Sequence, residues 1–126
     1  MSQKKRILIV DDALFMRTML KRIINGAGEF QIDEAECGSQ ALTLYEAHRP
    51  DLVLLDISMP EMSGIEVLKE LRKRDPSAYI IMCSAIGQES MITEAVDCGA
   101  ADFIVKPFLP DHIIKAVNSI GAEGES

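Results

Sequence analysis

The sequence contains no tryptophan, only three cysteines and only two histidines among its 126 residues. The cysteines, Cys37, Cys83 and Cys98, are widely spaced and form no CxxC pair. This spacing argues against a disulfide framework or a zinc site. We therefore expect reduced cysteines that are buried or half-buried, as in a cytoplasmic protein.

Long apolar runs and an excess of basic residues are also missing. No apolar stretch approaches the roughly 20 residues of a membrane span, and the apolar segment after the basic start, residues 7–10, is too short for a signal peptide. The formal net charge is −7. This acidity disfavours direct binding to nucleic acids or to anionic membranes.

The residues that are present suit one soluble globular domain. Apolar residues make up 48% of the chain and charged residues 26%, which is an ordinary balance for such a domain. We expect a single domain over residues 1–126, with its core at about residues 6–120. Residues 121–126 have no apolar anchor, and we expect them to fray.

Five short segments have the pattern of strands. Residues 52–55 are all apolar and end on Asp56, which is typical of a strand buried on both faces. Within residues 30–35, Phe30 and Ile32 alternate with polar residues, which fits an edge strand. The other predicted strands cover residues 6–10, 79–83 and 102–105.

Five helical segments alternate with these strands. They are predicted at about residues 13–25, 39–48, 64–74, 89–98 and 110–120. The apolar stripe of the first consists of Phe15, Met16, Met19, Leu20, Ile23 and Ile24. Ser63 and Glu66 match a capping box, and Gly99 is a helix stop. The alternation predicts an α/β fold with a doubly wound parallel sheet, helices on both faces and right-handed crossovers.

Polar side chains stand where the predicted strands end: Asp11 and Asp12, Asp56, Ser84 and Lys106. Strand ends of this kind form the binding edge of doubly wound sheets. Either early aspartate also suits a helix N-cap, and Lys106 alone would suit a solvated lysine. Five polar groups at equivalent positions favour a ligand site instead.

The chemistry of this set suits a phosphoryl group. Three neighbouring carboxylates repel one another unless a cation joins them, and an all-oxygen ligand set favours Mg²⁺, with Mn²⁺ as an alternative. Lys106 and Ser84 can neutralise and hydrogen-bond phosphoryl oxygens. Asp56, on the middle strand, is the best candidate nucleophile.

Other phosphate-binding classes fit less well. A flavin-binding protein needs a Ser/Thr/Gly-rich loop where this chain has Asp11 and Asp12, and no GxxxxGK[ST] motif is present. A Mg²⁺ phosphatase of the haloacid-dehalogenase type remains an alternative. That class needs a second aspartate two residues after the nucleophile, where this chain has Ser58.

About residues 6–120 resemble the receiver domain of bacterial response regulators, a flavodoxin-like fold with strand order 2-1-3-4-5. The matching features are Asp11-Asp12, Asp56 with Met59-Pro60 and Gly64, Ser84-Ala85, and Lys106-Pro107-Phe108. Residues 11–17 and 102–108 most resemble the stand-alone chemotaxis regulators of this family.

The resemblance implies a role for each site residue. Asp56 is expected to accept a phosphoryl group from the phosphohistidine of a sensor histidine kinase. Mg²⁺ is expected on the side chains of Asp12 and Asp56 and the backbone carbonyl of Ser58, with Asp11 acting mostly through water. Lys106 is expected to pair with the phosphoryl group, and its bond to Pro107 is expected to be cis.

The resemblance also implies an output. Ser84 and Phe103 occupy the switch positions, although spacing alone fits Phe103 equally well as a core residue. Their movement changes the face of the fourth helix, fifth strand and fifth helix, where a flagellar motor switch protein is expected to dock. A phosphatase is a further candidate partner, and a monomer is expected. A phosphorelay intermediate and the detached receiver of a transcription factor remain alternatives.

No enzyme activity is expected beyond self-phosphorylation from a phosphodonor and autodephosphorylation. Ser58 and Ile86 occupy the two positions that line the path of the hydrolytic water in this family. Ile86 supplies no polar group to orient that water. We therefore expect slow, partner-dependent dephosphorylation.

Overall fold

The computed structural model describes residues 4–85 and 87–125, with side chains described as far as residue 120. Strands and helices alternate along the chain as β1 Lys5–Val10, α1 Leu14–Ala27, β2 Phe30–Ala35, α2 Gly38–His48, β3 Leu52–Asp56, α3 Gly64–Arg74, β4 Ile80–Ser84, α4 Glu89–Asp97, β5 Asp102–Val105 and α5 Pro110–Glu125. This alternation confirms the predicted α/β class.

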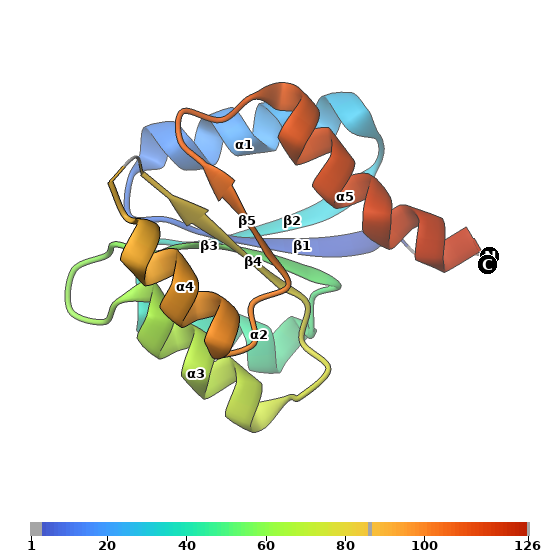
Figure 1. Cartoon of the computed structure of the whole chain (residues 1–126). Helices are drawn as coiled ribbons and strands as arrows, with labels where there is room; N and C mark the ends of the chain where they lie inside the picture. The colour runs from blue at the N-terminus through green and yellow to red at the C-terminus, as the bar shows by residue number, and fades with distance from the viewer. Residues whose placement is uncertain (1–3, 86, 126) are drawn as a thin grey trace.

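The strands form one parallel sheet in the order β2-β1-β3-β4-β5. The predicted strand order is therefore confirmed, with β3 at the centre and β2 at an edge. Helices α1 and α5 cover one face of the sheet, and α2, α3 and α4 cover the other (Figure 1).

The core has two layers because strand side chains alternate between the faces. In β1, Ile7 and Ile9 pack into the layer beneath α1 and α5, whereas Leu8 and Val10 pack into the layer beneath α2 and α3. Every residue of β3 is buried. This burial on both faces explains why the central strand has four consecutive apolar residues.

The predicted start of α3 is confirmed in detail. The Ser63 hydroxyl accepts a hydrogen bond from Glu66 N at 3.2 Å, and Glu66 Oε1 accepts one from Ser63 N at 2.9 Å. The predicted cysteine states are also confirmed, since Cys83 is buried and Cys37 and Cys98 are half-buried, all without a disulfide.

Helix α1 differs from its prediction at two points. Its N-cap is Ala13 rather than an aspartate, although Asp11 Oδ1 accepts a hydrogen bond from Ala13 N at 2.9 Å. Phe15, expected in the inward stripe, is 71% exposed, whereas Arg17 is buried. The guanidinium of Arg17 has polar partners beneath the helix. The helix is therefore rotated so that the Arg17 side chain, and not the Phe15 ring, faces the sheet.

Helix α5 continues to Glu125, beyond the predicted end near residue 120. Among the residues with described positions, no helix has the length and apolar character needed to cross a bilayer.

Candidate phosphoryl and metal site

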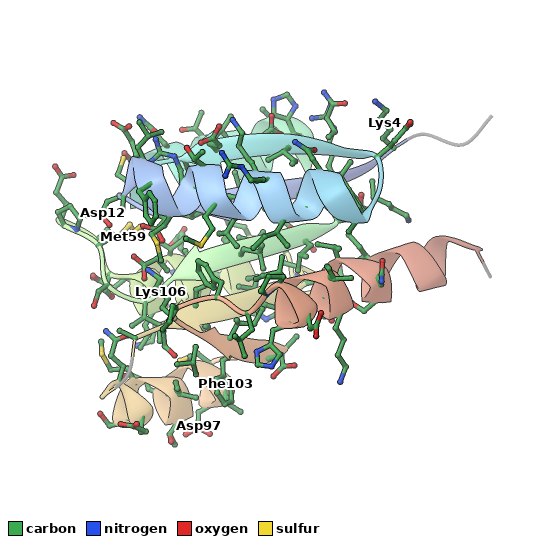
Figure 2. The ribbon with its side chains drawn as sticks, turned by 90° about the horizontal axis from the view of Figure 1, so that it is seen from above. Lys4, Asp12, Met59, Asp97, Phe103 and Lys106 are labelled. Carbon is green, nitrogen blue, oxygen red and sulfur yellow. The ribbon has the colours of Figure 1, made fainter. Side chains whose placement is uncertain are left out.

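The polar residues predicted at the strand ends meet at one edge of the sheet. Lys106 Nζ lies 3.0 Å from Asp11 Oδ2 and 3.1 Å from Asp56 Oδ1. Carboxylate oxygens of Asp11, Asp12 and Asp56 all lie within 4.8 Å of one another. Asp12 and Lys106 point to this edge, beside Met59 of the loop after β3 (Figure 2).

Strand register explains this meeting. Val10 pairs with Leu55, so Asp11 follows β1 at the level where Asp56 ends β3. Asp56 in turn pairs with Cys83, the residue before Ser84. Ser84 pairs with Val105, the residue before Lys106. Residues up to 95 positions apart in sequence therefore lie in hydrogen-bonding contact.

Asp56 is in an electrostatically unusual position. Only 5% of it is exposed, and burial together with the neighbouring Asp11 charge raises the pKa of Asp56 to about 6. Lys106 and the Ser58 N–H, which donates to Asp56 Oδ1 at 3.4 Å, act in the opposite direction. Burial also opposes the charge of Lys106, but its contacts with Asp11 and Asp56 raise its pKa on balance.

Ser84 contributes a hydroxyl without a partner. It is fully buried, and within the described part of the chain its Oγ forms no hydrogen bond. Its backbone carbonyl accepts from Lys106 N at 2.7 Å, which fixes the two strand ends together. A buried unpaired hydroxyl is costly, so a movement that gave the Ser84 hydroxyl a partner would be favourable.

Gly64 lets the loop after β3 close against the site. Its N–H donates to the Ile57 carbonyl at 2.7 Å, and a Cβ at this position would collide with the backbone carbonyl of Asp56. A residue with a side chain would displace the segment that carries Asp56 and Ser58. The close backbone approach therefore requires glycine.

Comparisons with known proteins agree with this geometry. The family model described as the response regulator receiver domain matches residues 7–118. The chain belongs to this receiver family. It is 53% identical to the chemotaxis protein CheY of Thermotoga maritima over 116 residues, covering 92% of this chain and 97% of that protein. It is 56% identical to CheY of Bacillus subtilis over 113 residues, covering 90% and 94%.

Solved structures show the same fold. The crystal structure of CheY4 from Vibrio cholerae superposes with a TM-score of 0.85 at 28% identity, covering 94% of this chain and 99% of that one. This protein is thus a receiver domain of the two-component response regulators, similar to the chemotaxis CheY proteins.

The acidic cluster of this receiver fits a divalent cation. Receiver domains bind Mg²⁺ at an acidic pocket. Here Asp12 is exposed whereas Asp11 and Asp56 are buried, so the cluster has an open side. The donor atoms are all oxygens, the ligands that Mg²⁺ prefers. The three carboxylates carry more negative charge than Lys106 can neutralise.

Three further positions that the resemblance assigned to the site are the Lys106–Pro107 bond, Phe103 and Ile86. The peptide bond between Lys106 and Pro107 is cis. Phe103, on β5, is 41% exposed (Figure 2). It lines a cavity together with His112 and Lys115 of α5. It is therefore not a core residue. Ile86, named above for the water path, lies outside the described residues.

Sequence reasoning missed two residues that support the site. The buried Arg17 donates from Nη1 to the Asp11 carbonyl at 2.8 Å and from Nε to Glu34 Oε1 at 2.9 Å. Gln88 bonds Ala85 and Ser58 across two loops. For Arg17, the only sequence signal is an arginine beside the apolar stripe; for Gln88 there is none, because its partners are set by loop geometry.

Proposed function

We propose that this receiver is a phosphorylation-activated response regulator that accepts a phosphoryl group on Asp56. The observation that carries the proposal is the position of Lys106 Nζ, 3.1 Å from Asp56 and 3.0 Å from Asp11. An ammonium in this place neutralises charge on a group bound to Asp56. The unpartnered hydroxyl of Ser84 supplies a second donor nearby.

The two oxygens of Asp56 have different tasks. Oδ1 accepts hydrogen bonds from Lys106 and from the Ser58 N–H. Oδ2 is therefore the better nucleophile. Its lone pair attacks the phosphorus of a kinase phosphohistidine, an O–P bond forms, the P–N bond breaks, and the electron pair returns to the imidazole nitrogen. A pKa of about 6 leaves most of Asp56 ionised at neutral pH.

The metal ligands would be the side chains of Asp12 and Asp56 and the carbonyl of Ser58, with Asp11 acting through water. Mg²⁺, or Mn²⁺ in its place, supplies positive charge beside the phosphoryl oxygens when it is bound. Lys106 holds Asp11 and Asp56 at a fixed separation, and Arg17 fixes the backbone of Asp11 from below.

The output would follow from Ser84 and Phe103. Movement of the Ser84 hydroxyl toward the phosphoryl group is expected to let the half-exposed Phe103 ring turn inward. This changes the surface of α4, β5 and α5, where a flagellar motor switch protein would dock. The names of the relatives support a chemotaxis role. The regulator we propose is cytoplasmic and monomeric, and a sensor histidine kinase supplies its phosphoryl group.

The biochemical class can be tested with acetyl phosphate, Mg²⁺ and intact-mass measurement. We expect one added phosphoryl group, which disappears in Asp56→Asn and without Mg²⁺. Asp75→Asn is the matched control, because it removes an aspartate that is remote from Lys106, and it should still be phosphorylated. Phosphorylation of Asp56→Asn to the same extent as the unsubstituted protein would refute the proposal.

Two further measurements address the finer assignments. A pull-down with flagellar switch components should recover more protein after phosphorylation, and equal recovery in both states would contradict the chemotaxis role. Ile86→Glu should accelerate autodephosphorylation because it supplies a polar group that can orient the hydrolytic water, whose path positions 58 and 86 are expected to line. An unchanged rate would contradict that role for residue 86.

A further inference from the structure

Gln88 connects two loops through both ends of its side-chain amide. Its Oε1 accepts a hydrogen bond from Ala85 N at 2.6 Å, and its Nε2 donates to the Ser58 hydroxyl at 2.8 Å. The backbone N–H of Ala85 can only donate, so the orientation of the amide is fixed by its partners. Gln88 is only half-exposed, and this side chain forms a bridge rather than extending into solvent.

Both partners of Gln88 adjoin the proposed phosphoryl chemistry. Ala85 directly follows Ser84, whose buried hydroxyl forms no hydrogen bond in the described part of the chain. Ser58 lies two residues after Asp56, and its N–H donates to Asp56 Oδ1. One amide therefore ties the loop after β3 to the loop after β4.

Starting helix α4 does not require this bridge. Gln88 is the N-cap residue of α4, yet its side chain makes no capping bond to that helix. The contact with Ala85 is local and is accompanied by a backbone bond from Gln88 N to Ala85 O at 3.3 Å. The contact with Ser58, 30 residues away in sequence, does nothing for the helix. It fixes one loop relative to the other.

We propose that Gln88 is a positioning residue that holds the loop after β4 in its resting position and thereby slows phosphorylation of Asp56. The inference rests on the proposed function. Movement of Ser84 toward a phosphoryl group carries the adjoining Ala85 and the Gln88 tied to it along, and breaks the bond from Gln88 to Ser58 in the other loop. The bridge therefore stabilises the resting arrangement relative to the phosphorylated one. A variant without the bridge should reach the phosphorylated arrangement more readily.

The first test compares Gln88→Met with Gln40→Met. Methionine keeps the length of the side chain but cannot form the bridge. Gln40 is the matched control because its Oε1 also accepts from a backbone N–H, that of Glu36 at 3.0 Å, in the loop between β2 and α2 rather than in the loops after β3 and β4. With acetyl phosphate and saturating Mg²⁺, Gln88→Met should be phosphorylated about threefold to tenfold faster, the range expected for the one hydrogen bond between the loops. Gln40→Met should match the unsubstituted protein.

A double-variant cycle separates the bridge from a general effect on the loop. Ser58→Ala keeps the backbone carbonyl and removes only the second contact of Gln88. If Gln88 acts through Ser58, the double variant should be no faster than Gln88→Met alone. Independent, additive effects would overturn the inference, as would equal rates for Gln88→Met and the unsubstituted protein.

A second measurement examines the resting protein without any phosphodonor. Solvent exchange of the Ala85 amide, followed by NMR, should accelerate in Gln88→Met and stay slow in Gln88→Glu, which retains an acceptor oxygen. Unchanged exchange in Gln88→Met would overturn the bridge itself. Absence of phosphate on Asp56 in the unsubstituted protein would instead refute the proposed function and, with it, the role of Gln88.

Discussion

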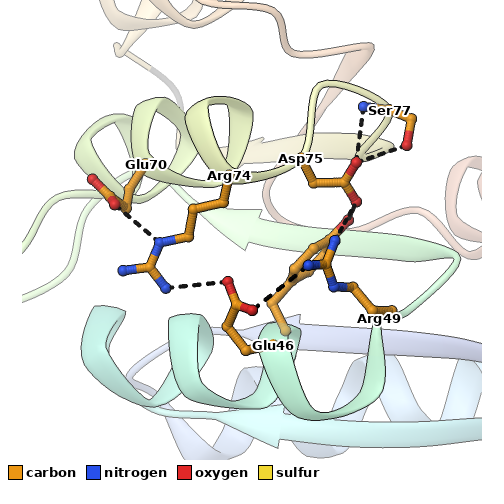
Figure 3. Close-up of polar contacts among 7 residues, drawn as sticks. Glu46, Arg49, Glu70, Arg74, Asp75 and Ser77 are labelled. Atoms are coloured by element: carbon orange, nitrogen blue, oxygen red, sulfur yellow. Dashed lines mark hydrogen bonds and ion pairs between the residues drawn. The ribbon is translucent and has the colours of Figure 1, made fainter.

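Asp56 and Asp75 are two aspartates with opposite electrostatic environments. Asp75 follows α3 and accepts hydrogen bonds from the Tyr45 hydroxyl at 2.7 Å and from Arg49 Nη1 at 3.1 Å (Figure 3). Its other oxygen accepts from Ser77 Oγ and N at 2.7 and 3.1 Å. Tyr45 and Ser77 lower the pKa of Asp75 to about 2.

Asp56 has fewer donors and a competing acid. Burial and the charge of Asp11 raise the pKa of Asp56 to about 6, although Lys106 contacts both carboxylates. Two buried acids share one ammonium, whereas Asp75 alone has four donor groups. The contrast separates a carboxylate that stabilises the fold from one held ready for a ligand.

The surroundings of Asp75 also show which contacts contribute to stability. Arg74 bonds Glu70 at 3.0 Å and lies 3.5 Å from Glu46, and these pairs are largely exposed (Figure 3). Exposed ion pairs of this kind contribute little. The buried Tyr45 ring and its hydroxyl are therefore the main link between α2 and the end of α3.

Among the changes that test this comparison, binding of Mg²⁺ should have the largest effect on the free energy of unfolding. An ion that binds only the folded protein at 100 times its dissociation constant raises the free energy of unfolding by about 2.7 kcal/mol. Urea unfolding with and without Mg²⁺ measures this. Asp12→Asn should lose the stabilisation and Asp75→Asn should keep it. Equal stabilisation of both variants would contradict a metal site at the acidic edge.

Asp56→Asn should stabilise the metal-free protein. Asparagine removes a charge that is penalised by burial and by Asp11, so the free energy of unfolding at pH 7.5 should rise by about 2 kcal/mol. Urea unfolding in the presence of EDTA measures the change. A loss of stability would show that the contact of Asp56 with Lys106 outweighs the repulsion, and the contrast with Asp75 would then fail.

The strand-end site could largely be predicted from the sequence. Asp11, Asp56 and Lys106 each follow an apolar run, and in a parallel sheet the ends of such runs meet, so their convergence needed no side-chain detail. The exposure of Phe15 and the burial of Arg17 could not be predicted, because helix rotation depends on polar partners supplied by β1 and β2.

The hydrogen-bond partners of Asp75 could not be predicted from the sequence either. In sequence it reads only as the residue before Pro76 that ends a helix. Its partner Tyr45 lies 30 positions earlier and looks like one more apolar residue of α2. The apolar pattern of α2 accounts for the burial of Tyr45, but a hydrogen bond between two helix ends depends on how far each helix extends.

Asp75→Asn should destabilise the protein, opposite in sign to Asp56→Asn. Asparagine can still accept from Tyr45, but the hydrogen bonds lose their ionic character and one oxygen becomes an amide group facing donors. We expect the free energy of unfolding to fall by about 1.5 kcal/mol at pH 7.5. The two aspartate variants measured side by side by urea unfolding provide the test; shifts of the same sign would contradict it.

Tyr45→Phe has the smallest expected effect, and that effect should depend on pH. Loss of the hydroxyl should lower the free energy of unfolding by about 1 kcal/mol at pH 7. The pKa of Asp75 is lowered from 3.8 to about 2, so its stabilising contribution is complete above about pH 4 and is lost as the pH falls through about 2. The difference in the free energy of unfolding between Tyr45→Phe and the unsubstituted protein should therefore shrink over that pH window, as measured by urea unfolding.

Tyr79→Phe is the matched control, because the Tyr79 hydroxyl pairs with Ser119 Oγ at 3.2 Å and not with a carboxylate. Its effect should be constant with pH, and an equally constant effect for Tyr45→Phe would show that the hydroxyl does not set the pKa of Asp75.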